Sequence, residues 1–489
     1  MRRYKKQIIY TIIILMFVIF IVVISPRKMQ NDTFWSIKVG EKIVNEGIFG
    51  LDNFSIHEGL YYIAHHFLTD VLIYVIYSFA GFNGLYILEV VLALIMAGML
   101  YILNKEISDS KTVAAIMLFL QMCIMTMYIA VRAQMISFIL FILELILLEK
   151  YMKNRKKSYI IGLSLIPIIL ANFHMGTVPF YFVILGVYII SLFKIKVPFL
   201  QCVEQIDKIR IKELFVVSII GLVTIFVNPY FIDGVIYPFK TFGNEFINTT
   251  ISEFQALSVS FDGGYSILFI ITILFILIIN KNKIKLQDFL LIFGTMLMSF
   301  MAIRYVSLFV ICSVVVLRYV GISINDITLK KEEMKAIKVT SVLSFVMMTV
   351  TLFSGYMIKS QVKYIPDDSY PVQAVDFLKE NMNANDRIFN YYDWGSYLML
   401  NDIKVYIDSR CDLYTKEYNG TDIANDYNKL TKCDSEYKNI IEKYNLNIFL
   451  MPINTQLDTL LNENDEFEMI YKDNTAVIYK QKMLQKYYN

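Results

Sequence analysis

Titratable and aromatic side chains gather in the first long polar stretch of the chain, residues 26–67. This stretch holds three of the four histidines (His57, His65 and His66), and Asp32 lies near its beginning. A connection between two membrane helices needs only a few residues, whereas a long polar loop of this composition is typical of a segment that faces a substrate. A carboxylate beside an acceptor hydroxyl can take its proton as a general base. The stretch therefore predicts the mouth of an active site, with Asp32 as the first candidate for catalysis.

Further polar residues lie where later apolar runs end or in the loops that follow: Arg132, His174, Glu253 and Arg304. A guanidinium stays charged when partly desolvated and offers a planar fork of donors to a phosphate. We therefore expect Arg132 and Arg304 to bind a phosphate group. His65 or His66 would orient the catalytic carboxylate or stabilise the departing phosphate.

The composition indicates a polytopic membrane protein. Of the 489 residues, 56% are hydrophobic and 18% are charged, against roughly a quarter charged in soluble domains. The formal net charge of +3 does not point to nucleic acid, because the charges are segregated along the chain. Five scattered cysteines predict neither a disulfide scaffold nor a zinc site. Cys411 and Cys433 share a polar region, and a bridge between them is left open.

Eleven apolar runs are long enough to cross a bilayer. They lie near 8–25, 84–103, 112–130, 134–149, 158–173, 176–193, 213–228, 265–280, 286–302, 304–320 and 337–356. The first run is read as a retained helix, because no small-residue cleavage site follows it. The run at 68–80 is too short to cross and carries Asp70, so we expect an interfacial or re-entrant helix there.

The distribution of basic residues predicts the topology. With a cytoplasmic N-terminus, the inner segments carry 24 Lys and Arg, and the outer connections before residue 357 carry 7. The positive-inside rule predicts this asymmetry, and a shift by one helix would scramble it. The long loops 26–67 and 229–264 and all the candidate site residues then fall on the outer face. Lipids would surround the helices of a protein placed in the plasma membrane.

A change of composition divides the chain into two expected parts. Residues 1–356 form the transmembrane domain, and residues 357–489 form a polar tail with 15 Lys and Arg against 21 Asp and Glu. Its alternating runs RIFNYY, KVYID, NIFLM and TAVIYK predict strands, and VQAVDFLKENM and SEYKNIIEKY predict amphipathic helices. A stretch of this length can bury its own core, which predicts a small extracytoplasmic α/β domain.

A series of short motifs resembles one family, in order and nearly from end to end. The first loop offers Asp32-Thr33-Phe34-Trp35-Ser36, Asp52-Asn53-Phe54-Ser55 and His65-His66-Phe67-Leu68. Later come Arg132-Ala133-Gln134, Asn172-Phe173-His174, Asn228-Pro229, Glu253-Phe254, Tyr392-Asp393-Trp394-Gly395-Ser396-Tyr397-Leu398 and Ile407-Asp408-Ser409-Arg410. The series is similar to that of the GT-C superfamily of membrane glycosyltransferases, in the bacterial branch near RgtA/B/C/D-like and oligosaccharyltransferase-like proteins.

The resemblance implies an inverting transferase that takes a sugar from a polyprenyl-phosphate donor, with the acid of the first outer loop as base. It implies a GT-C-like α-helical fold and a cell-envelope glycan, lipid or protein as acceptor. Asn31 stands where many GT-C enzymes have a second acid beside Asp32, and Ser36, His66, Phe67 and Ala133 also depart from the family pattern. No metal site and no cofactor are therefore predicted, and a divalent metal requirement is left open.

Each candidate also has a structural interpretation. Asp32 could cap the helix that follows it, and Arg132 or Arg304 could reach lipid headgroups from the ends of spans. His174 could satisfy carbonyls at a helix end, and Glu253 could be a solvated loop acid. The tail motifs are expected to be structural. Two other functions fit the pattern: a transporter or flippase of lipid-linked sugars, and a non-catalytic scaffold.

Overall fold

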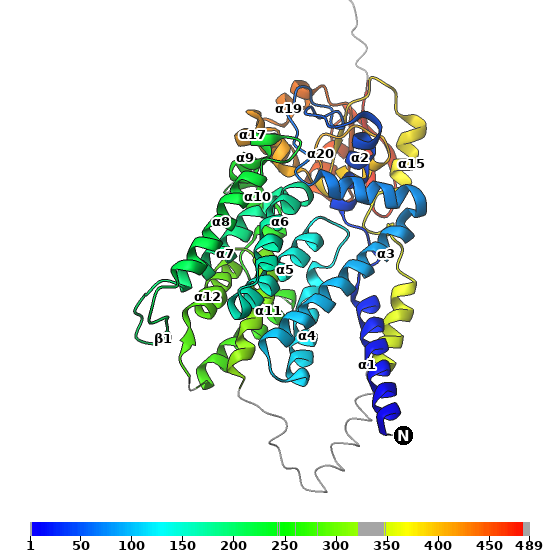
Figure 1. Ribbon diagram of the computed structural model, residues 1–489. Helices are drawn as coiled ribbons and strands as arrows, with labels where there is room; N and C mark the ends of the chain where they lie inside the picture. The colour runs from blue at the N-terminus through cyan, green and yellow to red at the C-terminus, as the bar shows by residue number, and fades with distance from the viewer. Residues whose placement is uncertain are drawn as a thin grey trace, which may run out of the picture. The chain divides into compact units, whose positions relative to one another are not determined.

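The computed structural model describes residues 2–241, 243, 245–259, 261–280, 282–320, 347 and 349–482 (Figure 1). Contacts between Cα atoms divide the chain into two compact units. The first unit contains Met1–Arg27, Leu85–Phe231 and Ser252–Val362. The second contains Lys28–Gly84, Ile232–Ile251 and Lys363–Asn489. The first loop is thus grouped with the tail, whereas the expected boundary at 356/357 left it with the helices.

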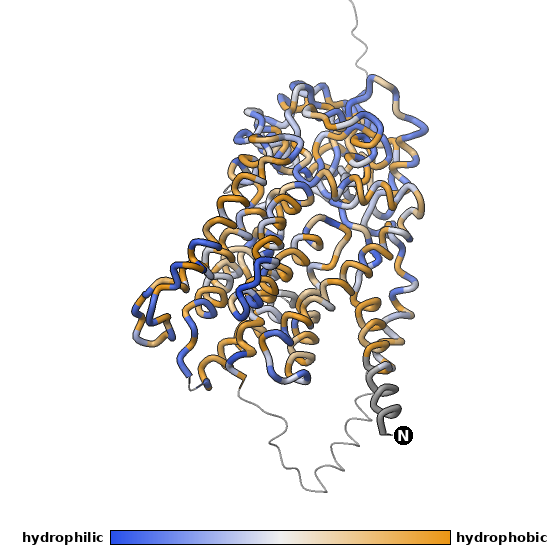
Figure 2. Tube along the Cα trace, viewed as in Figure 1, coloured by the Kyte–Doolittle hydropathy of each residue, from blue (hydrophilic) through white to orange (hydrophobic). Residues whose placement is uncertain are grey.

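The first unit is built from helices whose sequences are mostly apolar (Figure 2). These are α1 (Arg2–Ile24), α4 (Lys111–Met125), α5 (Gln134–Asn154), α6 (Lys157–Phe173), α7 (Val178–Ser191), α8 (Lys208–Thr224), α11 (Phe261–Ile279), α12 (Leu286–Met301) and α13 (Val306–Cys312). The 3-10 helix η5 (Ser313–Tyr319) follows α13, and residues 349–360 are helical. Every expected apolar run up to residue 320 coincides with a helix. The expected span 337–356 lies partly outside the described residues.

Two of the helices in the described part of the chain are long and apolar enough to cross a membrane by themselves. They are Phe67–Ile107, with 41 residues, and Lys111–Tyr128, with 18. Five others are apolar but have only 10–17 residues: Ile14–Ile24, Lys157–Phe173, Met175–Ser191, Gly263–Ile279 and Leu286–Met301. The helical character predicted for the chain is confirmed, and the number of eleven spans stays a prediction.

Helix α3 (Phe67–Ile107) is interrupted at Gly81. The φ of Gly81 is 57° and its ψ is −151°, a backbone conformation that a residue with a Cβ atom rarely adopts. The apolar run at 68–80 is therefore a separate helical stretch from the one that begins after Gly81. The sequence predicted this separation because the two runs differ in length and in polarity.

The second unit contains a four-stranded sheet formed by the tail. Its strands are β3 (Ile388–Asn390), β4 (Ile448–Pro452), β5 (Phe467–Lys472) and β6 (Ala476–Gln481), in the order β3-β4-β6-β5. Strands β3 and β4 are parallel, and the β4–β6 and β6–β5 pairs are antiparallel. The tail helices are α15 (Val372–Asn381), α16 (Gly395–Leu400), α17 (Lys416–Asn419), α18 (Ile423–Thr431), α19 (Tyr437–Tyr444) and α20 (Gln456–Asn462).

Most elements predicted in the tail are present, but the strand predicted at 404–408 is wrong. Val405 forms only an isolated bridge with Ser55 of the first loop. The backbone N–H of Tyr406 donates to the side-chain Oδ1 of Asn390 over 2.8 Å instead of to the backbone of a neighbouring strand. The backbone groups of this apolar segment are therefore hydrogen-bonded to a side chain and to the first loop. Strand β5 was not predicted, because an edge strand with charged residues shows little alternation.

Helices from other parts of the sequence also belong to the second unit: α2 (Asn31–Glu46), the part of α3 up to Gly84, α9 (Phe231–Thr241, from Ile232 onward) and α10 (Glu245–Thr250). Helix α2 approaches α3 closely at Gly40. A Cβ atom on Gly40 would lie 2.1 Å from the carbonyl oxygen of Asp70 and 2.7 Å from Tyr74 Cβ. Only glycine fits this contact, which fixes the helix that carries Asp32 against the segment that follows His65 and His66.

Candidate functional site

Asp32 lies in the first turn of α2, and its carboxylate is half-buried. The indole Nε1–H of Trp35, one turn further on, donates to Asp32 Oδ1 over 3.3 Å. The N-cap position belongs to Gln30, whose side chain makes no capping hydrogen bond. The interpretation of Asp32 as the capping residue is therefore wrong in position. An acid in the first turn still interacts favourably with the helix dipole.

The rings of His65 and His66 form an aromatic cluster in the second unit. The His66 ring lies 4.7 Å from the Trp35 ring, and the His65 ring stacks on Tyr237 at 4.3 Å. His66 Nδ1 lies 2.9 Å from Oδ1 of Asp70, which is fully buried. Trp35 thus contacts both Asp32 and His66, so the three predicted residues of the first loop share one cluster.

The carboxylates of this cluster act on the imidazole of His66. Burial lowers the pKa of His66, but Asp70 and Asp32 together raise it by more, so this pKa lies above its ordinary value of 6.5. His66 thus stands between the two carboxylates of the cluster. Asp70 was singled out in the sequence only for its place in a short apolar run, and its spacing of four residues from His66 is the signal that points to this pair.

Arg132, Glu253 and Arg304 form a second cluster, within the first unit. Arg132 follows the 3-10 helix η1 (Thr126–Tyr128), and its guanidinium donates to Glu253 Oε1 over 2.5 Å. The Arg304 guanidinium lies over the Phe254 ring, 4.4 Å from its centroid. The backbone supports this arrangement, because the N–H of Ile303 donates to the carbonyl of Gln255 over 2.9 Å.

The pKa of Glu253 shows how strongly the two arginines act on it. Burial raises this pKa, but Arg132, Arg304 and a hydrogen bond from Gln134 together lower it by more. Glu253 is therefore ionised and ion-paired rather than a freely solvated loop acid. The cluster holds two guanidinium groups and one carboxylate, so one positive charge remains for an anionic ligand.

His174 forms a separate group with hydroxyl side chains in the same unit. The residue ends α6, and its Nδ1 lies 2.8 Å from Ser137 Oγ. Ser137 Oγ in turn lies 3.0 Å from Thr177 Oγ1, which donates to the His174 carbonyl over 2.9 Å. The side chain of His174 is thus bonded to a hydroxyl group. Ser137 and Thr177 carried no distinguishing pattern in the sequence.

A small pocket of about 30 Å³ lies beside these residues, and Gln134, Thr177 and Arg304 line it together with aromatic side chains. That volume exceeds the roughly 15 Å³ needed for one ordered water.

The predicted site residues separate into two groups, one in each unit. The first unit holds Arg132, His174, Glu253 and Arg304, and the second holds Asp32, His65 and His66.

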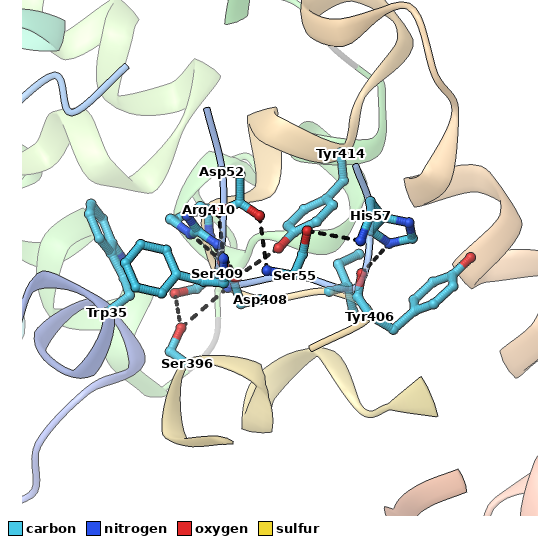
Figure 3. Close-up of polar contacts among 12 residues, drawn as sticks. Trp35, Asp52, Ser55, His57, Ser396, Tyr406, Asp408, Ser409, Arg410 and Tyr414 are labelled. Atoms are coloured by element: carbon cyan, nitrogen blue, oxygen red, sulfur yellow. Dashed lines mark hydrogen bonds and ion pairs between the residues drawn. The ribbon is translucent and has the colours of Figure 1, made fainter. Parts of the chain in front are cut away.

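The tail motifs have a structural role in the second unit, as the sequence predicted (Figure 3). The Arg410 guanidinium donates twice to Asp408, to Oδ1 over 3.0 Å and to Oδ2 over 2.6 Å. Its third contact is Asp52 Oδ1 at 2.7 Å. Tyr414 donates to Asp408 Oδ2, and the N–H of Ser55 donates to Asp52 Oδ2. This buried network joins the first loop to the tail, and Asp52 and Ser55 belong to it rather than to a catalytic group.

Trp394 and Gly395 extend this buried core. Trp394 is buried, and its indole N–H donates to the carbonyl of Ser369 over 3.0 Å. Gly395 has a helical φ of −56°, so its backbone conformation does not require glycine. A Cβ atom there would lie 2.0 Å from the carbonyl oxygen of Ile407, so close approach is the reason for glycine.

The sequence-based predictions also concern the cysteines and the possible metal ligands. All five cysteines are free, so Cys411 and Cys433 form no bridge. In the described part of the chain, no group of three or more His, Cys, Asp or Glu side chains is placed to hold a metal ion. The expectation of a site without metal stays a prediction.

Comparison with known proteins gave matches among solved structures alone: no protein-family model matched, and no curated protein had a similar sequence. One match is the oligosaccharyltransferase AglB from Archaeoglobus fulgidus, in complex with an inhibitory peptide and a dolichol-phosphate. The identity is 10%, the TM-score is 0.59, and the match covers 98% of this chain and 75% of AglB. The same enzyme tethered to an acceptor peptide matches at 12% identity with a TM-score of 0.60, over 97% and 74% of the two chains.

A second protein matches over the full length of both chains. ArnT from Cupriavidus metallidurans, bound to undecaprenyl phosphate, is 10% identical with a TM-score of 0.58, and 98% of each chain is covered. AglB and ArnT are both members of the GT-C superfamily. The fold that the motifs predicted is confirmed: this chain has the fold of the GT-C membrane glycosyltransferases.

Proposed function

We propose that the chain is an integral membrane glycosyltransferase that moves a sugar from a polyprenyl-phosphate donor to a cell-envelope glycan, lipid or protein. The observation that carries this proposal is the cluster of Arg132, Glu253 and Arg304, with its excess positive charge, on a GT-C fold. Solved relatives of this fold hold dolichol-phosphate or undecaprenyl phosphate. A guanidinium pair is suited to the phosphate of such a carrier.

In the proposed mechanism, Asp32 accepts the proton of an acceptor hydroxyl. The hydroxyl oxygen then bonds to the anomeric carbon of the sugar while the bond from that carbon to the phosphate oxygen breaks. The attack comes from the face opposite the leaving group, so the configuration inverts. Arg304 and Arg132 stabilise the negative charge that develops on the departing polyprenyl phosphate, which lowers the barrier because the charge grows in the transition state. The proposal includes no cofactor.

The proposed topology places eleven spans in the plasma membrane, with the N-terminus in the cytoplasm and residues 357–489 outside. Its support is the 24-to-7 distribution of basic residues and the coincidence of apolar runs with helices. The donor's lipid tail would then stay in the bilayer while the sugar reaches the outer face. Lipid-linked donor, envelope acceptor and membrane lipids are the proposed partners, and nucleic acid is not.

The test compares surface and lipid-linked glycans from cells that carry the wild type, Asp32→Asn, or a deletion. Asp32→Asn removes the base but keeps the shape and the acceptor for the Trp35 hydrogen bond. We expect the deletion and Asp32→Asn to lose the same glycan while the variant accumulates normally in the membrane. Asp376→Asn is a matched control, because Asp376 is exposed on α15.

The outcomes separate the rival functions. If the deletion removes a glycan and Asp32→Asn does not, the base assignment is wrong, and transport or scaffolding becomes the better account. If the protein were a flippase, its deletion would also make lipid-linked sugar accumulate on the cytoplasmic side of the membrane. Loss of the glycan in the Asp376→Asn control would attribute the effect to folding instead of to catalysis.

A further inference from the structure

A second pocket lies in the second unit and is much larger than the one beside Arg304. Its volume is about 410 Å³, within the range of roughly 300–1,000 Å³ found for small-molecule sites. The C-terminal half of α2, the Asn53–Phe54 pair and residues 399–404 line it. The mechanism proposed above uses none of these residues.

The charges in this pocket balance. Three lysines line it (Lys38, Lys42 and Lys404), and so do three carboxylates (Glu41, Glu46 and Asp402). Lys38 Nζ lies 2.6 Å from Asp402 Oδ1, and Lys42 Nζ lies 2.6 Å from Glu46 Oε2. A phosphate or another anion that bound Lys38 or Lys42 would have to displace these carboxylates. The pocket is therefore suited to a ligand without net charge.

The pocket also offers an apolar surface beside its polar groups. Phe54 is half-buried, and Met399 and Ile403 are buried at 1% and 7% exposure. Ammonium groups only donate hydrogen bonds, carboxylates only accept them, and the amides of Asn45 and Asn53 do both. A ligand that pairs with these ammonium, carboxylate and amide groups must carry many groups that both donate and accept hydrogen bonds, together with an apolar face. Sugar rings have this combination, with hydroxyl groups at the rim and C–H groups on the face.

We propose that this pocket binds the carbohydrate of a neutral glycan and that it is the acceptor subsite of the transferase. The acceptor role rests on the proposed function, whereas carbohydrate binding does not. We specify a neutral glycan because the three lysines that line the pocket are matched by three carboxylates. A peptide acceptor would need a row of backbone partners, and residues 38–46 are helical, so their backbone groups bond within the helix.

The test measures glycan binding by the full-length protein in lipid nanodiscs. The probes are neutral oligosaccharides that contain hexose or N-acetylhexosamine, immobilised on an array beside acidic glycans and unmodified peptides. Asn45→Trp fills the pocket from an exposed position on α2. Val44→Trp is the matched control, because Val44 is the neighbouring residue, is 49% exposed and does not line the pocket. Asp402→Asn removes one acceptor charge without adding bulk.

We expect the wild type and Val44→Trp to bind the same neutral glycans, and Asn45→Trp and Asp402→Asn to bind them at least about tenfold more weakly. Binding of acidic glycans or peptides alone, absence of glycan binding, or equal binding by Asn45→Trp and Val44→Trp would each overturn the proposal. The transferase test depends on Asp32, which does not line this pocket. Failure of the transferase test with intact glycan binding would therefore remove only the acceptor role, and loss of binding would leave the transferase proposal untouched.

Discussion

At the scale of single residues, the two arginines of the first unit differ in their partners. Arg132 pairs with Glu253, whereas Arg304 lies over the Phe254 ring and lines the small pocket. An arginine held by an aromatic face keeps its donors available to a phosphate. Arg304 is therefore the better candidate for direct contact with the leaving group, and Arg132 for positioning Glu253.

Arg304→Lys is expected to lower kcat/KM for the lipid-linked donor by about tenfold to a hundredfold. This range corresponds to about 1.5–3 kcal/mol for a charge-assisted hydrogen bond that a lysine cannot form in the same geometry. Consumption of donor by membranes measures the effect. Arg155→Lys is the control, because Arg155 is an exposed arginine that pairs with Glu213. An equal rate for Arg304→Lys and Arg155→Lys would exclude Arg304 from phosphate contact.

His57 makes the stability of the second unit depend on pH. Its Nε2–H donates to the carbonyl of Tyr406 over 2.8 Å, and burial lowers its pKa from 6.5 to about 4 (Figure 3). The unfolded chain therefore binds an extra proton as the pH falls through this window. We expect the melting temperature to decrease between pH 6.5 and 4 and this contribution to level off below pH 4. His57→Gln keeps an N–H donor and should show a shallower decrease. Identical pH profiles for the two proteins would contradict the assignment.

The candidate site could be predicted in part from residue types alone. Asp32, His65 and His66 share one cluster, and Arg132, Glu253 and Arg304 share another, whereas His174 bonds to Ser137. The distribution of basic residues predicted that these residues lie on one face of the membrane. It could not reveal Ser137, Thr177 or Tyr237, because hydroxyl and phenol groups occur throughout membrane helices and become distinctive only through their partners.

At the scale of elements, the contact between α2 and α3 sets the position of the first-loop cluster. Gly40→Ala would force a Cβ atom into the carbonyl of Asp70, which lies 2.1 Å from that position. Overpacking of this kind typically costs about 1–3 kcal/mol, so we expect a lower melting temperature and a loss of transferase activity. Gly98→Ala, also within α3, is the control, because nothing lies within 4 Å of its Cβ position. Equal melting temperatures for both variants would show that the helices separate without cost.

Helices could be predicted better than strands. Apolar runs give a long and redundant signal, and those up to residue 320 all became helices. Strands β3, β4 and β6 alternate enough to be predicted, but the segment 404–408 alternates equally and forms no strand. The segment 404–408 differs from these strands because its partners, Ser55 and Asn390, are distant in sequence. A local pattern contains no information about such partners.

At the scale of the whole molecule, the chain's own cysteines can test the proposed topology. Cys433 lies half-buried in the tail, and Cys202 lies half-buried in the basic segment 194–212. In variants that retain only one cysteine, we expect a membrane-impermeant maleimide to label Cys433 on intact cells. Cys202 should be labelled only after permeabilisation, because the positive-inside rule places it in the cytoplasm. The reverse pattern would invert the topology and remove the outward active site.

The Asp52–Arg410 ion pair has a consequence for synthesis of the protein. The two residues are 358 positions apart, and translation proceeds at about 5–20 residues per second, so Arg410 follows Asp52 by roughly 20–70 s. The strand β6, which pairs with both β4 and β5, is made later still. Under the proposed topology, the first loop would remain on the outer side of the membrane throughout that interval, without its partner Arg410. Helix insertion would then precede closure of the second unit, and a premature stop before β6 would leave a loop that was completed hundreds of residues earlier without the tail to which it bonds.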